Sequence, residues 1–137
     1  MNILIVHNHY QIPGGEDQVA AQEAELLRAH GHKVITYYRD NSELKDFSLG
    51  QKILLPFRTI YNPRTCREIR KCIRENKIDV VHVHNTLMLV SPAVYYAARK
   101  EKVPVVQTIH NFRLLCPGAT FYRDDQIGED CLKKGLG

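Results

Sequence analysis

The chain has 137 residues, 44% of them hydrophobic and 25% charged, four cysteines and a formal net charge of +4. This composition predicts one globular domain over residues 1–137, and the charge is too small to indicate nucleic-acid binding. No apolar run approaches the roughly 20 residues that span a bilayer, and Met1 leads into an apolar strand without a basic signal segment, so we expect a cytoplasmic protein with free thiols.

The first third of the chain predicts a βαβ unit. An apolar strand over 3–7 is followed by a glycine loop and by a helix from Glu16, whose apolar residues recur at helical spacing. Gly31 ends this helix, and a strand rich in β-branched and aromatic residues covers 33–38. Such a unit indicates a right-handed crossover between parallel strands.

The remainder repeats this alternation after an irregular stretch. Residues 39–62 lack a clear period, so we expect only one or two helical turns there. Asn62-Pro63 and Ser91-Pro92 are each typical of a helix start. The predicted elements are a helix over 63–76, a strand over 79–84, a helix over 92–100 and a strand over 103–109. The predicted fold class is α/β, a three-layer Rossmann-like sandwich with a mainly parallel sheet.

Three predicted strands end in the same dipeptide, His-Asn. The pairs are His7-Asn8, His84-Asn85 and His110-Asn111. Ligands of open α/β sheets bind at the carboxyl edge of the strands, where these side chains would emerge together. The repeat therefore predicts a ligand site at that edge.

The loop with Gly14 and Gly15 precedes a helix, where free N–H groups attract anions and glycines admit a close ligand. The dinucleotide fingerprint Gly-x-Gly-x-x-Gly and the P-loop motif are both absent, so the loop alone is also compatible with an ordinary turn.

A metal site is the weaker interpretation of the histidines. His82 and His84 share one face of a strand and could bind a metal with His110 or His7. No carboxylate lies beside them in the sequence, and Cys116 and Cys131 do not form C-x-x-C pairs. We therefore expect no metal.

The helix over 63–76 carries a basic face opposite its apolar one. This face consists of Arg64, Arg67, Lys71 and Arg74. Such a face is usually solvated, but it can also rest on anionic lipid, at about 1 kcal/mol for each basic residue.

Taken in order, these motifs resemble the N-terminal half of family 4 glycosyltransferases. The residues that carry the resemblance are the opening strand and those of 13–16, 29–34, 78–84 and 105–111. The stretch 113–118 and residues 129–132 resemble a subgroup that acts on cell-surface polysaccharides. Members of that subgroup often have a Cys-Glu-x-Cys element, in which Gly128 replaces the first cysteine here.

The resemblance implies a GT-B enzyme of two facing Rossmann-like domains. It would transfer a hexose with retention from a nucleotide-sugar to a saccharide or lipid-linked acceptor, without a metal or other cofactor. It would act in polysaccharide or glycolipid synthesis in the cytoplasm, or peripherally at the inner face of the membrane. The C-terminal donor-binding domain is not part of these 137 residues, so the chain alone is expected to be inactive.

The resemblance also implies roles for individual residues. His110 would be catalytic, donating hydrogen bonds beside the transferred sugar. The donor- or acceptor-binding residues would be Gly14, Gly15, Glu16, His84, Asn85, Asn111 and Arg113. In that set, His84 and Asn85 would line the acceptor side, and Arg113 would neutralise phosphate.

Two other function classes stay open. The first is a stand-alone Rossmann-like module that binds a nucleotide or phosphate without catalysis. The second is a metal-dependent hydrolase, which requires His82, His84 and His110 to converge. The sequence lacks the nucleophile elbow Gly-x-Ser-x-Gly and the His-Glu-x-x-His motif.

Overall fold

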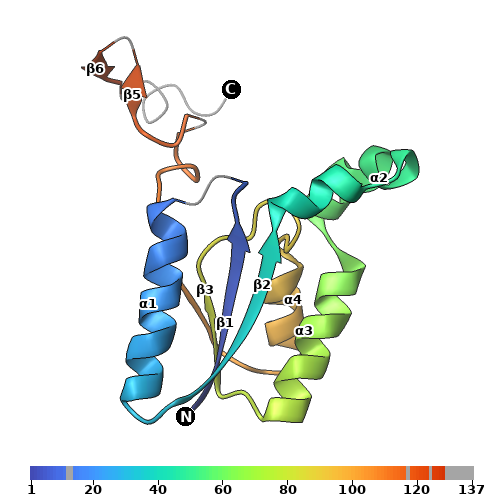
Figure 1. Cartoon of the computed structure of the whole chain (residues 1–137), viewed down its shortest axis with the longest axis vertical. Coiled ribbons are helices and arrows are strands. Elements are labelled where there is room, and N and C mark those ends of the chain that lie inside the picture. Colours follow the sequence, from blue (N-terminus) through green and yellow to red (C-terminus); the bar gives the residue numbers. More distant parts are fainter. Residues whose placement is uncertain (12–13, 117, 124, 129–137) are drawn as a thin grey trace.

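The computed structural model describes residues 1–11, 14–116, 118–123 and 125–128. Its main sheet is formed by strands β1 (Asn2–His9), β2 (Lys33–Asp40), β3 (Val80–Val83) and β4 (Val105–Gln107). The strands are parallel and lie in the order β2-β1-β3-β4. Helix α1 (Gly15–Ala29) covers one face, and α3 (Pro63–Asn76) and α4 (Ala93–Lys100) cover the other (Figure 1). The predicted three-layer α/β fold is confirmed.

Strand β1 is buried on both faces because it lies inside the sheet. Side chains two apart share a face, so Leu4 and Val6 pack in the layer of α3 and α4. Ile3 and Ile5 pack with Ala24 of α1 on the opposite face. An uninterrupted apolar run is typical of such a strand, and it positions the polar end of β1 at the edge of the sheet.

Helix α3 begins and ends where the sequence predicts. The Asn62 side chain accepts hydrogen bonds from the N–H groups of Arg64 and Thr65, and Pro63 occupies the first turn. The helix ends before Lys77, which has a left-handed backbone with φ of 50°. The helix start was readable from the sequence because the Asn62 cap and Pro63 act within a few residues.

The prediction of an irregular stretch over 39–62 is wrong for its second half. A 3₁₀ helix, η1 (Asn41–Asp46), is followed by a 12-residue helix, α2 (Leu49–Ile60). Ser48 and Gln51 form a reciprocal cap at the start of α2, and this pair is the signal that sequence reasoning missed. Pro56 inside the helix obscured the pattern.

The segment after β4 is more structured than expected. A short antiparallel pair is formed by β5 (Tyr122–Arg123) and β6 (Gln126–Ile127). Cys66 and Cys72 are free thiols, as predicted. Pro13 of the glycine loop and Cys131 lie outside the described residues. The single-domain boundary at 1–137 stays a prediction.

Candidate functional site

The carboxyl ends of β1, β3 and β4 bring the three histidines together. The ring centroids of His7 and His84 are 6.0 Å apart, and those of His84 and His110 are 5.2 Å apart. Nδ1 of His84 lies 3.0 Å from Nε2 of His110. The predicted convergence at this edge is confirmed, whereas the roles of these residues stay predictions.

His84 is a neutral imidazole in this setting. Burial, reinforced by the neighbouring imidazoles of His82, His110 and His7, lowers the pKa of His84 to about 4. A neutral ring has one N–H donor and one lone pair. When His84 donates from Nδ1 to Nε2 of His110, the proton of His110 is on Nδ1, which is then able to donate to a ligand.

Asp17 connects β1 to the glycine loop, and sequence reasoning gave it no such role. Its Oδ2 accepts a hydrogen bond of 2.7 Å from the Gly14 N–H, and its Oδ1 lies 2.7 Å from both His7 Nε2 and His9 Nδ1. Burial works to raise the pKa of Asp17, but the hydrogen bonds from Gly14, His7 and His9 outweigh it and lower this pKa. An anionic Asp17 therefore holds the loop, and the predicted support of the loop by His7 is confirmed.

Neither glycine of the loop is required by packing. A Cβ atom on Gly14 or Gly15 would meet no atom of the described residues within 4 Å, and neither glycine has a positive φ. The space beside the loop is open, which suits the approach of a ligand. Glu16 accepts a hydrogen bond of 3.2 Å from the Asn111 amide, so the start of α1 meets the segment after β4.

The side chains of Asn8 and Asn85, at this edge, form hydrogen bonds with backbone groups. Oδ1 of buried Asn8 accepts from the N–H groups of Leu89 and Val90, at 2.8 and 3.2 Å. The Asn85 amide donates to the Asn8 carbonyl, while its oxygen accepts from the Leu87 N–H. Asn85 was predicted to line an acceptor cleft, but both of its polar atoms bond to backbone.

Arg113 was predicted to neutralise phosphate, and it is exposed beyond the edge. Its side chain lies 3.4 Å from the Tyr10 hydroxyl, and its N–H donates to the Asn111 side chain. No carboxylate pairs with Arg113 within the described part of the chain, so its charge is available to a ligand.

Glu23 of α1 also reaches the histidine cluster. Its Oε2 lies 3.5 Å from Nδ1 of His82 and 3.3 Å from Nε2 of His84. The sequence has no carboxylate at ligand spacing beside these histidines, and the structure brings one to them from α1. The signal was a glutamate at helical spacing within the apolar stripe formed by Ala20, Ala24 and Leu27.

Two groups of residues have the composition of a metal site. One comprises His7, His9 and Asp17, and the other comprises Glu23, His82 and His84. Oδ1 of Asp17 is at hydrogen-bond distance from both of its histidines, whereas the atoms around Glu23 are farther apart.

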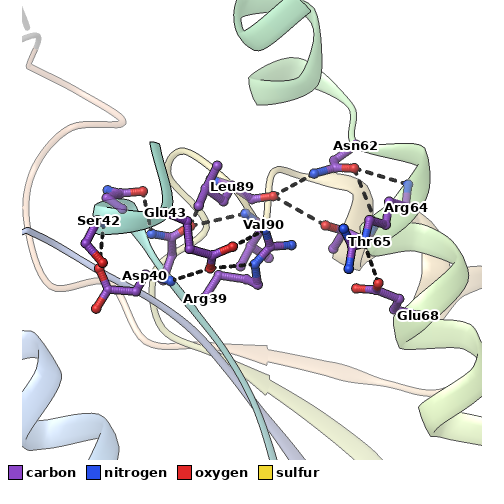
Figure 2. Close-up of polar contacts among 12 residues, drawn as sticks. Arg39, Asp40, Ser42, Glu43, Asn62, Arg64, Thr65, Glu68, Leu89 and Val90 are labelled. Atoms are coloured by element: carbon purple, nitrogen blue, oxygen red, sulfur yellow. Dashed lines mark hydrogen bonds and ion pairs between the residues drawn. The ribbon is translucent and has the colours of Figure 1, made fainter. Parts of the chain in front are cut away.

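A basic pocket of about 400 Å³ lies between β2, η1, α2 and α3. Its charged lining residues are Arg39, Glu43, Arg58, Arg64 and Arg67. Figure 2 shows that Arg39 pairs with Glu43 and Arg64 with Glu68. Arg58 and Arg67 have no ion pair with any described residue, so the pocket is suited to an anionic group.

The four basic residues predicted to form one face of α3 lie in two different environments. Arg64 and Arg67 line the basic pocket, whereas Lys71 and Arg74 pair with Glu75 and Glu101. The apolar face of α3 is buried in the core and is not available to a membrane. The neighbouring helix α2, by contrast, exposes several apolar side chains, those of Leu49, Ile53, Leu54, Phe57 and Ile60.

A family model, Glycosyltransferase Family 4, matches residues 13–128, which is most of the chain. The chain belongs to this family. The match includes the start of α1, the ends of β3 and β4 and the basic pocket, and the resemblance stated from the motifs is confirmed.

Several curated proteins are similar to this family 4 chain. It is 30% identical over 111 residues to a phosphatidyl-myo-inositol mannosyltransferase of Mycolicibacterium smegmatis, with 74% of this chain and 28% of that protein covered. It is 30% identical over 152 residues to an uncharacterized 42.6 kDa protein in the cps region of Klebsiella pneumoniae, with 90% of this chain and 40% of that protein covered. The chain thus spans 28% to 40% of the length of these relatives.

The fold also occurs outside the family. The C-terminal domain of a hydrogenase from Pyrococcus furiosus matches with a TM-score of 0.55 and 15% identity, over 79% of this chain and 90% of that one. At this identity, the likeness concerns the fold alone. Within the described residues, no helix is both long and apolar enough to cross a bilayer.

Proposed function

We propose that this chain is the N-terminal, acceptor-side domain of a GT-B enzyme that transfers a hexose, with retention, from a nucleotide-sugar to an acceptor in cell-surface polysaccharide or glycolipid synthesis. The family match supports sugar transfer. The observation that carries the proposal is the gathering of the glycine loop, His84 and His110 at one sheet edge. The donor half of the site would belong to a further domain.

His110 is the proposed catalytic residue. Its Nε2 is occupied by His84, which leaves Nδ1 to donate a hydrogen bond to the sugar as charge develops in the transition state. His84 acts on the substrate through His110, because its own ring is buried.

The proposed position of the donor diphosphate is the start of α1. Gly14 and Gly15 leave open space there, and the first-turn N–H groups of a helix attract anions. Exposed Arg113 would supply a further positive charge.

For the acceptor, we favour a lipid-linked molecule. The basic pocket suits an anionic head group, and the exposed apolar side chains of α2, beside this pocket, suit an acyl region. The mycobacterial relative is named for transfer to phosphatidyl-myo-inositol, which is an anionic lipid. This arrangement would place the enzyme at the cytoplasmic face of a membrane.

The proposal is tested by His110→Ala in the enzyme that carries this domain. We expect turnover to fall by about 10²-fold or more because a transition-state donor is lost, with little change in melting temperature. His30→Ala, at an exposed histidine after α1, is the control and should retain turnover. Unaltered turnover in His110→Ala, measured with a nucleotide-sugar and a lipid acceptor, would contradict the assignment.

A second candidate is a stand-alone module that binds a nucleotide or phosphate without catalysis. Arg58 and Arg67 of the basic pocket favour it, because neither has an ion pair with a described residue. A reading frame that continues past Gly137 into a second Rossmann-like half with paired glutamates would support the transferase and argue against this module.

A further inference from the structure

Three side chains converge where α1 passes the end of β3. Nδ1 of His82 and Nε2 of His84 lie 3.5 and 3.3 Å from Oε2 of Glu23, and all three atoms are within 4.8 Å of one another. Oε2 of Glu23 and Nε2 of His84 are buried, and neither has a hydrogen-bond partner among the described residues. The His84 side chain is 0% exposed. Unsatisfied buried polar atoms are costly, so this convergence calls for an occupant.

The second nitrogen of each imidazole is already engaged. Nε2 of His82 lies 2.8 Å from the Thr108 hydroxyl, and Nδ1 of His84 lies 3.0 Å from Nε2 of His110. When both rings donate to these partners, the lone pairs of the other two nitrogens face Glu23. Histidines that bind metals are oriented in this way, with the second nitrogen hydrogen-bonded to a neighbouring group.

We propose that Glu23, His82 and His84 bind a divalent transition-metal ion, with zinc the best fit. Zinc bonds to nitrogen and oxygen are about 2.0–2.2 Å long, so a tetrahedral ion holds its ligand atoms about 3.3–3.6 Å apart. The separations of Glu23 Oε2 from His84 Nε2 and His82 Nδ1, 3.3 and 3.5 Å, match this spacing. Two imidazoles disfavour magnesium and calcium, which prefer oxygen ligands.

The neighbouring group with Asp17 does not share this geometry. Its Oδ1 is 2.7 Å from both His7 Nε2 and His9 Nδ1, which is a hydrogen-bond distance and is shorter than the separation of two zinc ligands. The proposed ion would join α1 to β3 and leave one coordination position open. This site is additional to the proposed sugar transfer and does not depend on it.

The test is metal binding by the 137-residue chain after removal of metals with a chelator. We expect calorimetry to show one tight equivalent of Zn²⁺, and Co²⁺ to give the visible absorption typical of tetrahedral coordination. Zn²⁺ should also raise the melting temperature, because an ion that binds only the folded state stabilises it.

Matched variants assign the site. Glu23→Gln and His82→Gln should each remove the tight equivalent, and Thr108→Val should weaken it by about 10- to 100-fold by freeing the His82 ring. Glu25→Gln is the same change at an exposed position of the same helix and should bind like the unaltered chain. Asp17→Asn, in the other group, should also retain the ion.

Three results would overturn the proposal. They are the absence of a tight equivalent in the unaltered chain, retention of the ion by folded Glu23→Gln and His82→Gln, and its loss in Asp17→Asn alone. If the unaltered chain binds no tight equivalent of Zn²⁺, the cluster holds a water molecule or a proton instead. Circular dichroism and the melting temperature in chelator show whether each variant is folded.

Discussion

At the scale of single residues, His7 shows how burial and hydrogen bonding set a charge state. The ring is fully buried, and its Nδ1 has no hydrogen-bond partner within the described chain. Burial lowers the pKa of His7 below its usual 6.5, and this effect exceeds the opposing hydrogen bond to Asp17. His7 is therefore neutral in the folded state and donates from Nε2 to an ionised Asp17.

This charge state predicts a pH dependence of stability. Below pH 6.5, His7 binds a proton in the unfolded chain, whereas in the folded chain its lowered pKa keeps it neutral. The free energy of unfolding should therefore fall as the pH falls, by at most about 1.4 kcal/mol per pH unit for this group. Because the pKa of Asp17 is lowered in the folded chain, Asp17 stabilises the fold above pH 3.8, and this contribution to the free energy of unfolding is lost at lower pH. Urea unfolding in chelator at pH 7.5 and 5.5 measures the change.

The variant His7→Gln should be less stable than the unaltered chain at pH 7.5. Its free energy of unfolding should also fall less between pH 7.5 and pH 5.5. His30→Gln, at an exposed position, should keep the full loss. An equal loss in His7→Gln and the unaltered chain would show that His7 does not cause it.

At the scale of elements, helix α2 differs from its neighbours. None of its residues is buried, and it carries Lys52 and Arg58 but no acidic residue. The other long helices each bury an apolar face against the sheet. A helix with exposed apolar side chains and positive charge is suited to the surface of an anionic membrane.

We therefore predict that α2 carries membrane binding. Ile53 and Phe57 are 64% and 70% exposed, so the double change Ile53→Gln and Phe57→Gln should alter the free energy of unfolding by less than about 1 kcal/mol. Binding to vesicles of phosphatidylglycerol and phosphatidylcholine should fall at least tenfold, since inserting either side chain contributes about 1.5–3 kcal/mol. Vesicle co-sedimentation measures this binding.

The matched control is Leu26→Gln, which changes a 58% exposed apolar residue of α1. It should leave vesicle binding intact. Comparable binding by the α2 double variant and the unaltered chain would rule out α2 as the contact.

At the scale of the whole molecule, the candidate site occupies one edge of one Rossmann-like unit. The chain spans 28% of the mannosyltransferase relative. We predict that the 137 residues alone transfer no sugar, because the rest of the proposed donor site, beyond the start of α1, belongs to another domain. Turnover assays with nucleotide-sugars and lipid acceptors should show no product, and robust transfer by the purified chain would contradict this domain assignment.

Local patterns in the sequence were sufficient for much of the fold. The apolar run over 3–7 and the Asn62-Pro63 helix start predicted their elements, because strand burial and helix capping act between residues close in the chain. The same reasoning placed three histidines at one edge, since parallel strands share the direction of their carboxyl ends. It failed for α2, where Pro56 interrupts the pattern.

Contacts between distant residues required the folded chain. Glu23 and His82 are 59 positions apart. Helical spacing places Glu23 on the apolar face of α1, but nothing local to either residue indicates that this face meets His82. The basic pocket likewise joins side chains from several elements, whose distances depend on sheet order and on helix packing. The histidine edge was therefore predictable from the sequence, whereas the carboxylate that completes the proposed metal site was not.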